Sequence, residues 1–128
     1  AFHGVPGGHE FTSFVLGLYN AAGPGQTIDE DTLKKVEEIQ KSTDMKILVS
    51  LSCTMCPDLV IACQRIATKN KNIKAEVYDI RHFEDLKKKL ETDKTLTKKS
   101  REAINSIISS LETQKQNELK KFDNGECN

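Results

Sequence analysis

Two cysteines separated by two residues are the groups in this sequence best suited to chemistry. They stand in the segment Cys53-Thr-Met-Cys56-Pro57. A thiolate at one of them can attack a disulfide of another molecule, and the second thiol can then resolve the mixed disulfide by closing a small ring. The spacing therefore predicts thiol–disulfide exchange, with Cys53 as the attacking thiol and Cys56 as the resolving thiol.

The residues around the pair predict a position that favours a thiolate. The apolar run Ile47-Leu48-Val49 before it is typical of a short strand, and Pro57 suits the first turn of a helix, where a missing N–H costs little. A cysteine at a helix N-terminus lies near unpaired backbone N–H groups and the positive end of the helix dipole. Such surroundings lower the pKa of a cysteine from about 8.5 to roughly 3.5–7.5.

The sequence holds four cysteines, which leaves other uses of the pair open. The four cysteines could form two structural disulfides in a secreted protein. The pair could also supply half of a zinc site, or consist of two inert thiols. A zinc site needs two further ligands, which Cys63, Cys127 or His82 would have to provide. We favour one redox pair in a reducing compartment, with Cys63 acting as a small buried hydrophobic residue and Cys127 as a thiol of the tail.

The overall composition narrows the class of protein. The 128 residues include 19 Lys and Arg and 19 Asp and Glu, so the formal net charge is zero. This balance gives no reason to expect a nucleic-acid partner, and no apolar run approaches the roughly 18 residues of a membrane span. We expect a soluble, cytoplasmic domain with an appendage. Because the sequence begins at Ala1 rather than Met, we also expect it to be a piece of a longer chain.

Two helices are predicted before the cysteine pair. In residues 1–26, turn-rich ends bracket a short helix with an apolar stripe that we expect to be buried. Residues 27–43 predict a second helix with Asp29 as its N-cap and a single apolar face. The stripe of the first helix consists of Phe11, Phe14, Val15 and Leu18.

The central stretch, residues 45–90, predicts the order strand, helix, strand, helix. We expect the strands at 45–50 and 74–80 and the helices at 57–69 and 82–90. A short crossover between two strands implies a right-handed parallel unit. The predicted class is therefore α/β, and the unit is one half of a thioredoxin-like (glutaredoxin-like) fold, incomplete, with flanking helices.

The last stretch, residues 91–128, predicts a helical extension of the domain formed by residues 1–90. A long helix is expected from about Thr97 to Phe122, ending near Gly125. Its apolar stripe must be buried, either on its own domain or against a second copy of the chain. The stripe consists of Ile104, Ile107, Ile108 and Leu111.

Three blocks of the sequence together resemble a known family. They are Phe2-His-Gly-Val-Pro-Gly-Gly-His-Glu-Phe-Thr-Ser13, Tyr19-Asn-Ala-Ala-Gly-Pro-Gly25 and Ser50-Leu-Ser-Cys-Thr-Met-Cys-Pro-Asp58. Residues 1 to about 90 resemble the N-terminal domain of the flavoprotein component of alkyl hydroperoxide reductase, also called the peroxiredoxin reductase. The resemblance implies two fused thioredoxin-like folds. The second fold keeps the Cys-x-x-Cys pair and passes electrons from a flavin and a dithiol of the reductase body to a peroxiredoxin.

The resemblance also implies a role for Glu10, because the glutamate of this motif in the family lies near the dithiol and acts as its acid–base partner. The residues alone leave two interpretations open. Glu10 could have a pKa raised by its apolar neighbours, or it could be an acid that the dipole favours at a helix start. We expect the nearby His3 and His9 to be capping or surface groups, and His82 to be structural.

Two features of the family are absent from this sequence. No proline follows Pro57, so the loop with a cis-proline opposite the thiols is missing, and so is the flavin- and nicotinamide-binding body with its glycine-rich motifs. We therefore expect no cofactor or metal on this chain, with FAD and NADH only in a separate flavoprotein disulfide reductase. The prediction is a thiol–disulfide oxidoreductase that passes electrons toward a peroxiredoxin or another protein disulfide. The alternative is a non-catalytic thioredoxin-like module for interaction or assembly, with homo-oligomers possible.

Overall fold

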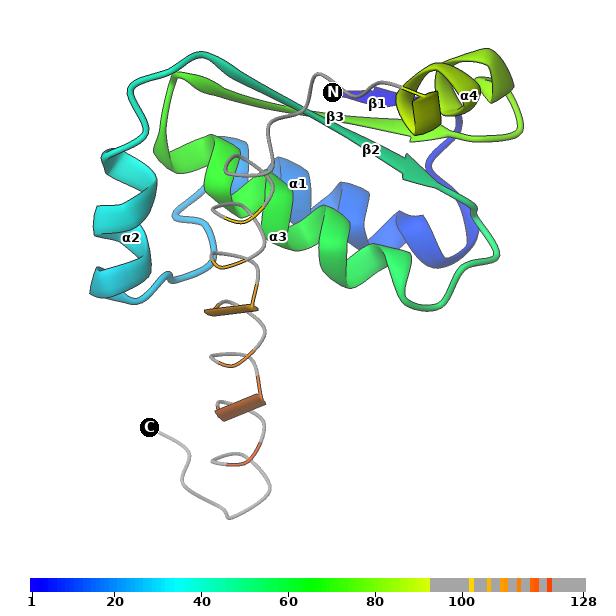
Figure 1. Cartoon of the computed structure of the whole chain (residues 1–128). Coiled ribbons are helices and arrows are strands. Elements are labelled where there is room, and N and C mark those ends of the chain that lie inside the picture. The colour runs from blue at the N-terminus through cyan, green and yellow to red at the C-terminus, as the bar shows by residue number, and fades with distance from the viewer. Residues whose placement is uncertain are drawn as a thin grey trace.

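A computed structural model describes residues 1–92 and eight further residues in the range from 102 to 120 (Figure 1). The predicted order of strand, helix, strand, helix is confirmed, with each boundary within two residues of its predicted place. The predicted helix from 97 to 122, with its stripe, lies outside the described residues. The elements are β1 (Phe2–His3), the 3-10 helix η1 (Gly8–Glu10), α1 (Phe11–Ala22), α2 (Glu30–Glu37), β2 (Thr43–Val49), α3 (Cys56–Lys69), β3 (Ile73–Asp79) and α4 (Glu84–Thr92).

The strands form a three-stranded parallel sheet in the order β1-β3-β2. The central residue Val77 is level with Phe2 on one side and with Ile47 on the other. The sequence did not predict β1, because a two-residue strand is too short to show alternation. Since all three strands are parallel, their carboxyl ends meet at one edge of the sheet.

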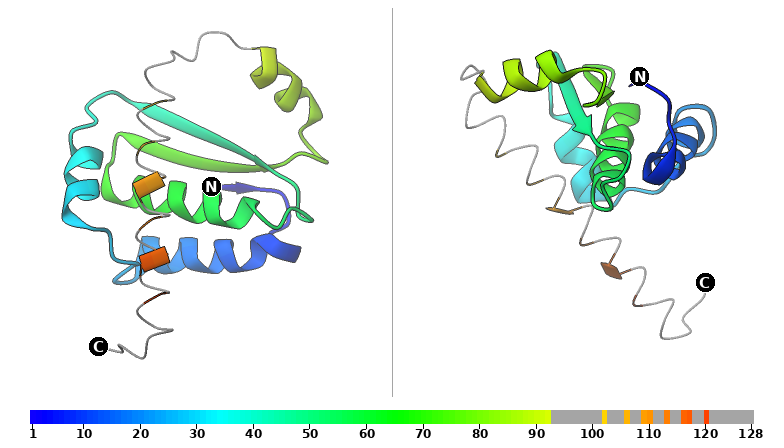
Figure 2. Two further views of the ribbon diagram at one scale, coloured as in Figure 1. Left: turned by 60° about the horizontal axis from the view of Figure 1, so that its bottom comes forward. Right: turned by 90° about the vertical axis from the view of Figure 1, so that its right-hand side faces the viewer.

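The core lies between one face of the sheet and α3, with α1 packed along the far side of α3 (Figure 2). Apolar residues alternate along β2 and β3, so one face of each strand is buried and the other is partly solvated. On the solvated face the Lys46 ammonium lies 3.0 Å from a Glu76 carboxylate oxygen. The buried apolar residues are Val36, Met45, Ile47, Val49, Val60, Ala62, Cys63, Ile66, Ile73 and Val77.

Three of the four residues of α1 that we predicted to be buried are exposed to solvent. Ser13 and Asn20 are the buried residues of this helix. The physical reason is close packing on α3: a Cβ at Gly17 would lie 2.8 Å from the Gln64 side-chain oxygen. Small and polar residues therefore face α3. Phe11, Val15 and Leu18 of the predicted stripe are exposed, whereas Phe14 is half-buried, with its ring 6.4 Å from that of Phe2. None of the helices among the described residues has the length and apolar character that a membrane span requires.

Helix α2 begins as predicted and ends earlier than predicted. The Asp29 carboxylate accepts a hydrogen bond of 2.9 Å from the backbone N–H of Thr32, which confirms the N-cap. The helix ends at Glu37 rather than at residue 43. The Asn70 side-chain amide donates to the carbonyl oxygens of Val36 (2.7 Å) and Ile39 (2.9 Å), which satisfies groups that a longer helix would have paired internally.

We therefore predict that Asn70→Ala lowers the free energy of unfolding by about 1–3 kcal/mol. It removes two hydrogen bonds to partly buried carbonyls and a third, of 2.8 Å, that the Asn70 side-chain oxygen accepts from the Asn72 N–H. Urea unfolding of the oxidised protein measures this change. The matched control is Asn72→Ala, which removes one side-chain hydrogen bond of 3.1 Å to the same Ile39 carbonyl. An effect of Asn70→Ala no larger than that of the control contradicts the role of Asn70 in ending α2.

Candidate functional site: a disulfide beside a buried carboxyl

The two predicted cysteines form a disulfide at the carboxyl edge of the sheet. Cys53 and Cys56 are bonded, with their Cα atoms 5.6 Å apart. The loop that follows β2 carries Cys53, and α3 begins at Cys56 with Pro57 in its first turn, so the predicted passage from strand to helix is confirmed. Both cysteines are half-buried.

The first turn of α3 points a backbone donor at the first sulfur. The N–H of Cys56 lies 3.2 Å from the Cys53 sulfur, and the N–H of Cys53 donates to the Ser50 carbonyl at 2.9 Å. A donor at this place, together with the helix dipole, stabilises negative charge on Cys53 once the disulfide is reduced. The helix begins at Cys56, so Cys53 is held just before the helix rather than within its first turn.

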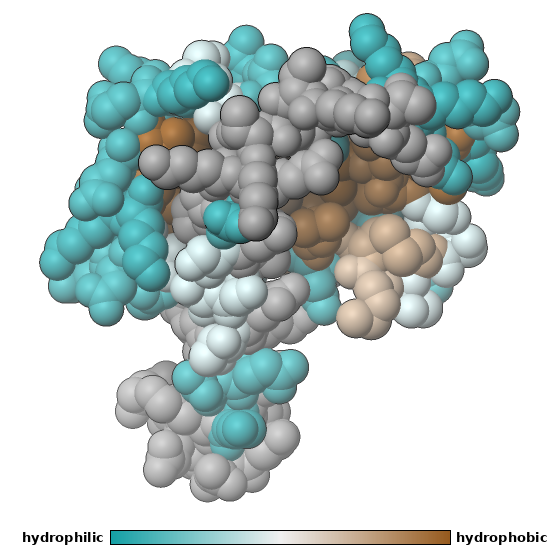
Figure 3. Space-filling view, in the orientation of Figure 1, coloured by the Kyte–Doolittle hydropathy of each residue, from teal (hydrophilic) through white to brown (hydrophobic). Residues whose placement is uncertain are grey.

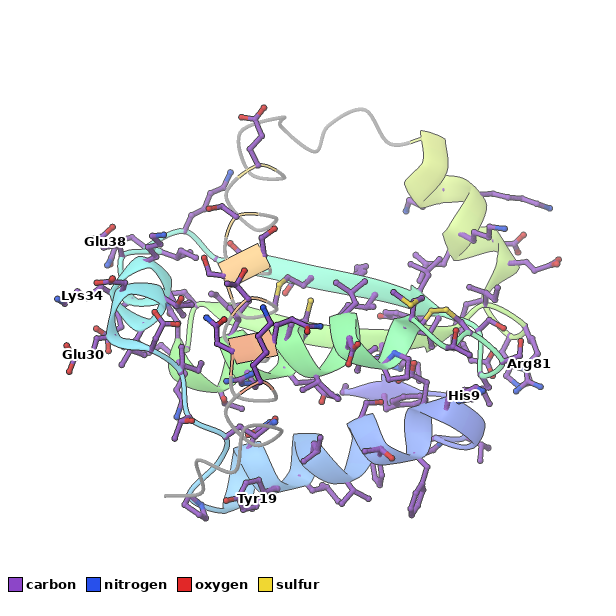
Figure 4. All side chains as sticks on the ribbon, turned by 90° about the horizontal axis from the view of Figure 1, so that it is seen from below. His9, Tyr19, Glu30, Lys34, Glu38 and Arg81 are labelled. Carbon is purple, nitrogen blue, oxygen red and sulfur yellow. A yellow bond between two sulfur atoms is a disulfide. The ribbon has the colours of Figure 1, made fainter. Side chains whose placement is uncertain are left out.

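Helix η1 is fixed to the loop that carries the disulfide. The N–H of His9 donates to the Leu51 carbonyl over 3.2 Å. Gly8, with φ of +55°, allows this approach, because a Cβ there would lie 2.7 Å from the Leu51 carbonyl oxygen. Figure 4 shows His9 and Arg81 at the end of the sheet where the disulfide lies. The segment that carries Glu10 is thus held against the loop two residues before Cys53.

The Glu10 side chain is completely buried. The Ser13 hydroxyl contacts both the Glu10 carbonyl oxygen, at 2.9 Å, and the Oε2 atom of its carboxyl group. The Oε1 atom has no hydrogen-bond partner within the described part of the chain. Burial raises the pKa of the Glu10 carboxyl above its ordinary value, and this effect outweighs the lowering by the Ser13 hydrogen bond and by His9. The carboxyl can therefore hold a proton at a pH where exposed glutamates have lost theirs.

A second buried carboxylate at this edge was missed by sequence reasoning. Asp79, the last residue of β3, is fully buried, and the Arg81 guanidinium lies 2.7 Å from its Oδ2 atom. This contact with Arg81 lowers the pKa of the Asp79 carboxyl. A Cβ at Gly4, whose φ is +132°, would lie 3.0 Å from the Asp79 Cβ, so the loop after β1 packs directly on this residue. The sequence did contain a signal for its burial. Asp79 stands two residues after Val77 in the same strand, so both side chains point to the buried face of the sheet.

The structure describes three of the remaining candidate residues, Cys63, His3 and His82. Cys63 is buried in the core as expected, and burial raises its pKa to about 11. His3 stacks on Tyr78, with ring centroids 4.3 Å apart, and His82 is exposed in the turn before α4, which begins two residues later than predicted. Cys127 lies outside the described residues. Among residues that the structure describes, no group of three or more His, Cys, Asp or Glu side chains could hold a metal.

Comparison with known proteins finds relatives over most of this chain. It is 39% identical over 84 residues to the alkyl hydroperoxide reductase AhpF of Pseudomonas aeruginosa, covering 66% of this chain and 16% of that protein. A Bacillus subtilis protein named NADH dehydrogenase is 36% identical over 78 residues, covering 61% of this chain and 15% of that protein. This chain thus spans about a sixth of the length of these two relatives. No family model matches.

A solved structure shares the fold. The NTD_N/C domain of the alkyl hydroperoxide reductase AhpF from Enterococcus faecalis superposes with a TM-score of 0.65 and 42% sequence identity. The match covers 72% of this chain and 44% of that chain. The arrangement of the sheet, the helices and the cysteine-bearing loop is therefore that of a thioredoxin-like N-terminal domain of this kind.

The geometry predicts an order of thiol reactivity. In the reduced protein at neutral pH, limiting iodoacetamide should modify Cys53 several-fold faster than Cys56, because the helix N-terminus stabilises the Cys53 thiolate. Cys63, with its pKa near 11, should stay unmodified until the protein unfolds. Peptide mapping by mass spectrometry identifies the first site. Fastest modification at Cys127 would show that exposure, rather than thiolate character, decides reactivity.

The buried carboxyl predicts a pH dependence of stability. A carboxyl whose pKa is raised by folding favours the native state below its ordinary value of 4.5, and this contribution is lost as pH rises through its pKa in the folded protein. Glu10→Gln keeps the shape and cannot ionise, so its melting temperature relative to the parent should rise with pH above about 4.5 and then level off. Glu37→Gln, at an exposed acid of α2, is the matched control for one lost charge. A difference between Glu10→Gln and the parent that does not change with pH would show that Glu10 is not perturbed.

Proposed function

Residues 1 to about 90 are homologous to the N-terminal domain of the alkyl hydroperoxide reductase AhpF, and we propose that they form a thiol–disulfide relay. The observation that carries the proposal is the Cys53–Cys56 disulfide at the start of α3, with the N–H of Cys56 directed at the first sulfur. The relay would pass two electrons at a time from a reductant to the disulfide of another protein. In this reading the chain is a thiol–disulfide oxidoreductase domain.

The exchange consists of two balanced steps. The Cys53 thiolate attacks a sulfur of the partner's disulfide, so a mixed disulfide forms and one partner thiolate leaves. The Cys56 thiolate then attacks the Cys53 sulfur, which closes the intramolecular disulfide and releases the second partner thiolate. Glu10 gives a proton to, or takes one from, the thiols during these steps. Three observations support this role: the burial of Glu10, its raised pKa, and its Oε1 atom, which has no hydrogen-bond partner among the described residues. The neighbouring His9 ties the segment to the Leu51 carbonyl.

The relatives suggest where the electrons come from and where they go. Their names describe an alkyl hydroperoxide reductase and an NADH dehydrogenase, so the reductant we propose is a flavoprotein disulfide reductase that uses NADH and FAD. The acceptor we propose is a peroxiredoxin, because a peroxiredoxin disulfide is the product when a hydroperoxide is reduced by its thiols. We place the relay in the cytoplasm, where a reducing environment keeps such a pair in turnover.

A second candidate function is a non-catalytic module for protein interaction. The observation that favours it is the incomplete sheet. The outer edge of β2 has no partner strand among the described residues, so they form only part of a thioredoxin-like sheet. A module of this kind needs no reversible disulfide. The redox behaviour of the cysteine pair therefore separates the two functions.

The proposed function predicts a reversible disulfide with a potential typical of reductase-type dithiols, roughly −200 to −270 mV. Equilibration with glutathione or dithiothreitol buffers, followed by alkylation and mass spectrometry, measures it in a variant with Cys63→Ala and Cys127→Ser. The matched control adds Cys53→Ser, which should abolish the two-electron transition. Two free thiols at Cys53 and Cys56 under mild oxidant would rule out the relay and leave the interaction module.

A further inference from the structure

Met55 stands between the two cysteines and is the most exposed of the large apolar side chains among the described residues. Its exposed fraction is 76%, whereas Cys53 and Cys56 are half-buried. An apolar side chain left in water forgoes the favourable free energy of burial. A methionine exposed beside a reactive disulfide therefore indicates a contact with another molecule.

The Met55 side chain has no structural role among the described residues. Met55 is the residue before the first residue of α3, and its side chain makes no capping hydrogen bond. The Cys53 sulfur accepts the N–H of Cys56 instead. Met55 also lies outside the buried core and the half-buried residues that pack on it. A residue that departs from the preference for a polar side chain at a helix start, with no gain for the fold, points to function.

Met55 and Leu59 form a small apolar patch beside the disulfide, which we call the Met55–Leu59 patch. The backbone of Met55 is already helical, with φ of −93° and ψ of −20°, and residues four apart face the same side of a helix. Leu59 is 39% exposed. Figure 3 shows hydrophobic residues over the start of α3, between the hydrophilic regions at α2 and α4. An apolar centre with a polar rim is the usual arrangement of a protein contact surface. The exposed polar residues next to the patch in the chain are Ser52, Thr54 and Asp58.

Disulfide exchange at Cys53 brings a partner onto this patch. In the mixed disulfide, a bond forms between Cys53 and a partner cysteine while the partner's own disulfide breaks and one partner thiolate leaves. The Cα atoms of two bonded cysteines are about 4.4–6.8 Å apart, and the next residue of a chain is about 3.8 Å further on. The residues beside the partner's cysteine thus lie within roughly 11 Å of the Cys53 Cα. Met55 is two residues from Cys53 and exposed, so their side chains can reach it.

From these observations we propose that Met55 selects the partner, favouring a disulfide whose cysteine has a large apolar neighbour in its own chain. This inference rests on the proposed thiol–disulfide relay. No charged residue occurs from Ser50 to Pro57, so an apolar contact is what this loop offers to a partner. The methionine side chain is flexible and polarizable, which lets it adapt to apolar surfaces of different shape. Met55 is thus a specificity-determining residue, and Cys53 and Cys56 remain the reacting groups.

Two synthetic peptide disulfides test this preference in the full chain. The probes are the symmetrical disulfides of acetyl-Leu-Cys-Gly-amide and acetyl-Ser-Cys-Gly-amide, and the reduced protein carries Cys63→Ala and Cys127→Ser so that only the pair reacts. Acid quenching and mass spectrometry give the rate of oxidation by each probe. The ratio of the two rates is divided by the same ratio measured with dithiothreitol, which corrects for the intrinsic reactivity of the probes. The corrected rate should be about fivefold higher with the leucine probe, and Met55→Gln should abolish this preference.

The ratio isolates the contact, because a change in the reactivity of Cys53 would alter both rates alike. Met55→Leu should keep the preference, since it keeps an apolar side chain of similar size. The matched control is Leu18→Gln, which makes the same change from apolar to polar at a residue that is 55% exposed on α1. Leu18 follows Gly17, which approaches Gln64, eight residues beyond Cys56 in α3. The control therefore lies away from the disulfide and should keep the preference.

The possible outcomes separate this inference from the relay. Equal corrected rates in the protein with Met55, or a preference that survives Met55→Gln, would overturn the role of Met55 and leave the relay intact. Loss of the preference in Leu18→Gln as well would also overturn it. A protein that reacts with neither probe would overturn the relay, and this inference with it. Loss in Met55→Gln alone, with the preference kept in the other two variants, supports the proposal.

Discussion

The parallel pairing of β3 with both of its neighbours is the constraint on which the rest of this structure depends. Because β1, β2 and β3 run in one direction, their carboxyl ends share one edge, and the loops that follow them come together there. Two glycines allow close approaches here that a side chain would hinder: Gly8 lies against the Leu51 carbonyl, and Gly4 lies against the Asp79 side chain. This edge carries the disulfide, the segment with the buried Glu10, and the ion pair of Asp79 with Arg81. An antiparallel β1 would carry Glu10 to the opposite end of the sheet.

Two buried carboxyl groups at the same edge have opposite electrostatic surroundings. Asp79 is paired with the Arg81 guanidinium and its pKa is lowered, so it stays ionised and fixes the turn after β3. The hydrogen-bond partner of the Glu10 carboxyl is the Ser13 hydroxyl, and no cation among the described residues bonds to it. Burial raises the pKa of Glu10. When two buried acids have pKa values shifted in opposite directions, one can serve as a fixed charge and the other as a proton carrier. This difference supports the proposed role of Glu10 as a proton carrier, and it gives Asp79 a structural role.

The sequence predicted the part of the fold that local pattern controls. The strand before the cysteines, the helix after them, the second strand and the parallel crossover follow from periodicity and turn residues, and the Asp29 cap follows from its side chain. What pattern could not show is which face of α1 is inward, because an apolar stripe predicts burial without identifying what buries it. Gly17 decides that question through its close approach to the Gln64 side chain of α3, which is a property of the pair of helices. Strand β1, at two residues, exists only through its pairing with β3. The end of α2 depends on Asn70, which is more than thirty residues away in sequence.

The groups at the carboxyl edge of the sheet do not depend on whether the sheet is complete. The match to the Enterococcus domain covers 44% of that chain, yet both thiols, the N–H directed at Cys53 and the buried carboxyl are all supplied by residues 8–56. Closing the disulfide needs only the turn that joins β2 to α3, because that turn fixes the two Cα atoms 5.6 Å apart. Additional strands would extend the sheet from the free edge of β2, and the edge chemistry lies at the ends of the strands rather than along their sides. In the proposed relay, parts outside residues 1–92 would therefore bear on which protein delivers electrons and which one receives them, while the described unit itself supplies the thiols and the buried carboxyl.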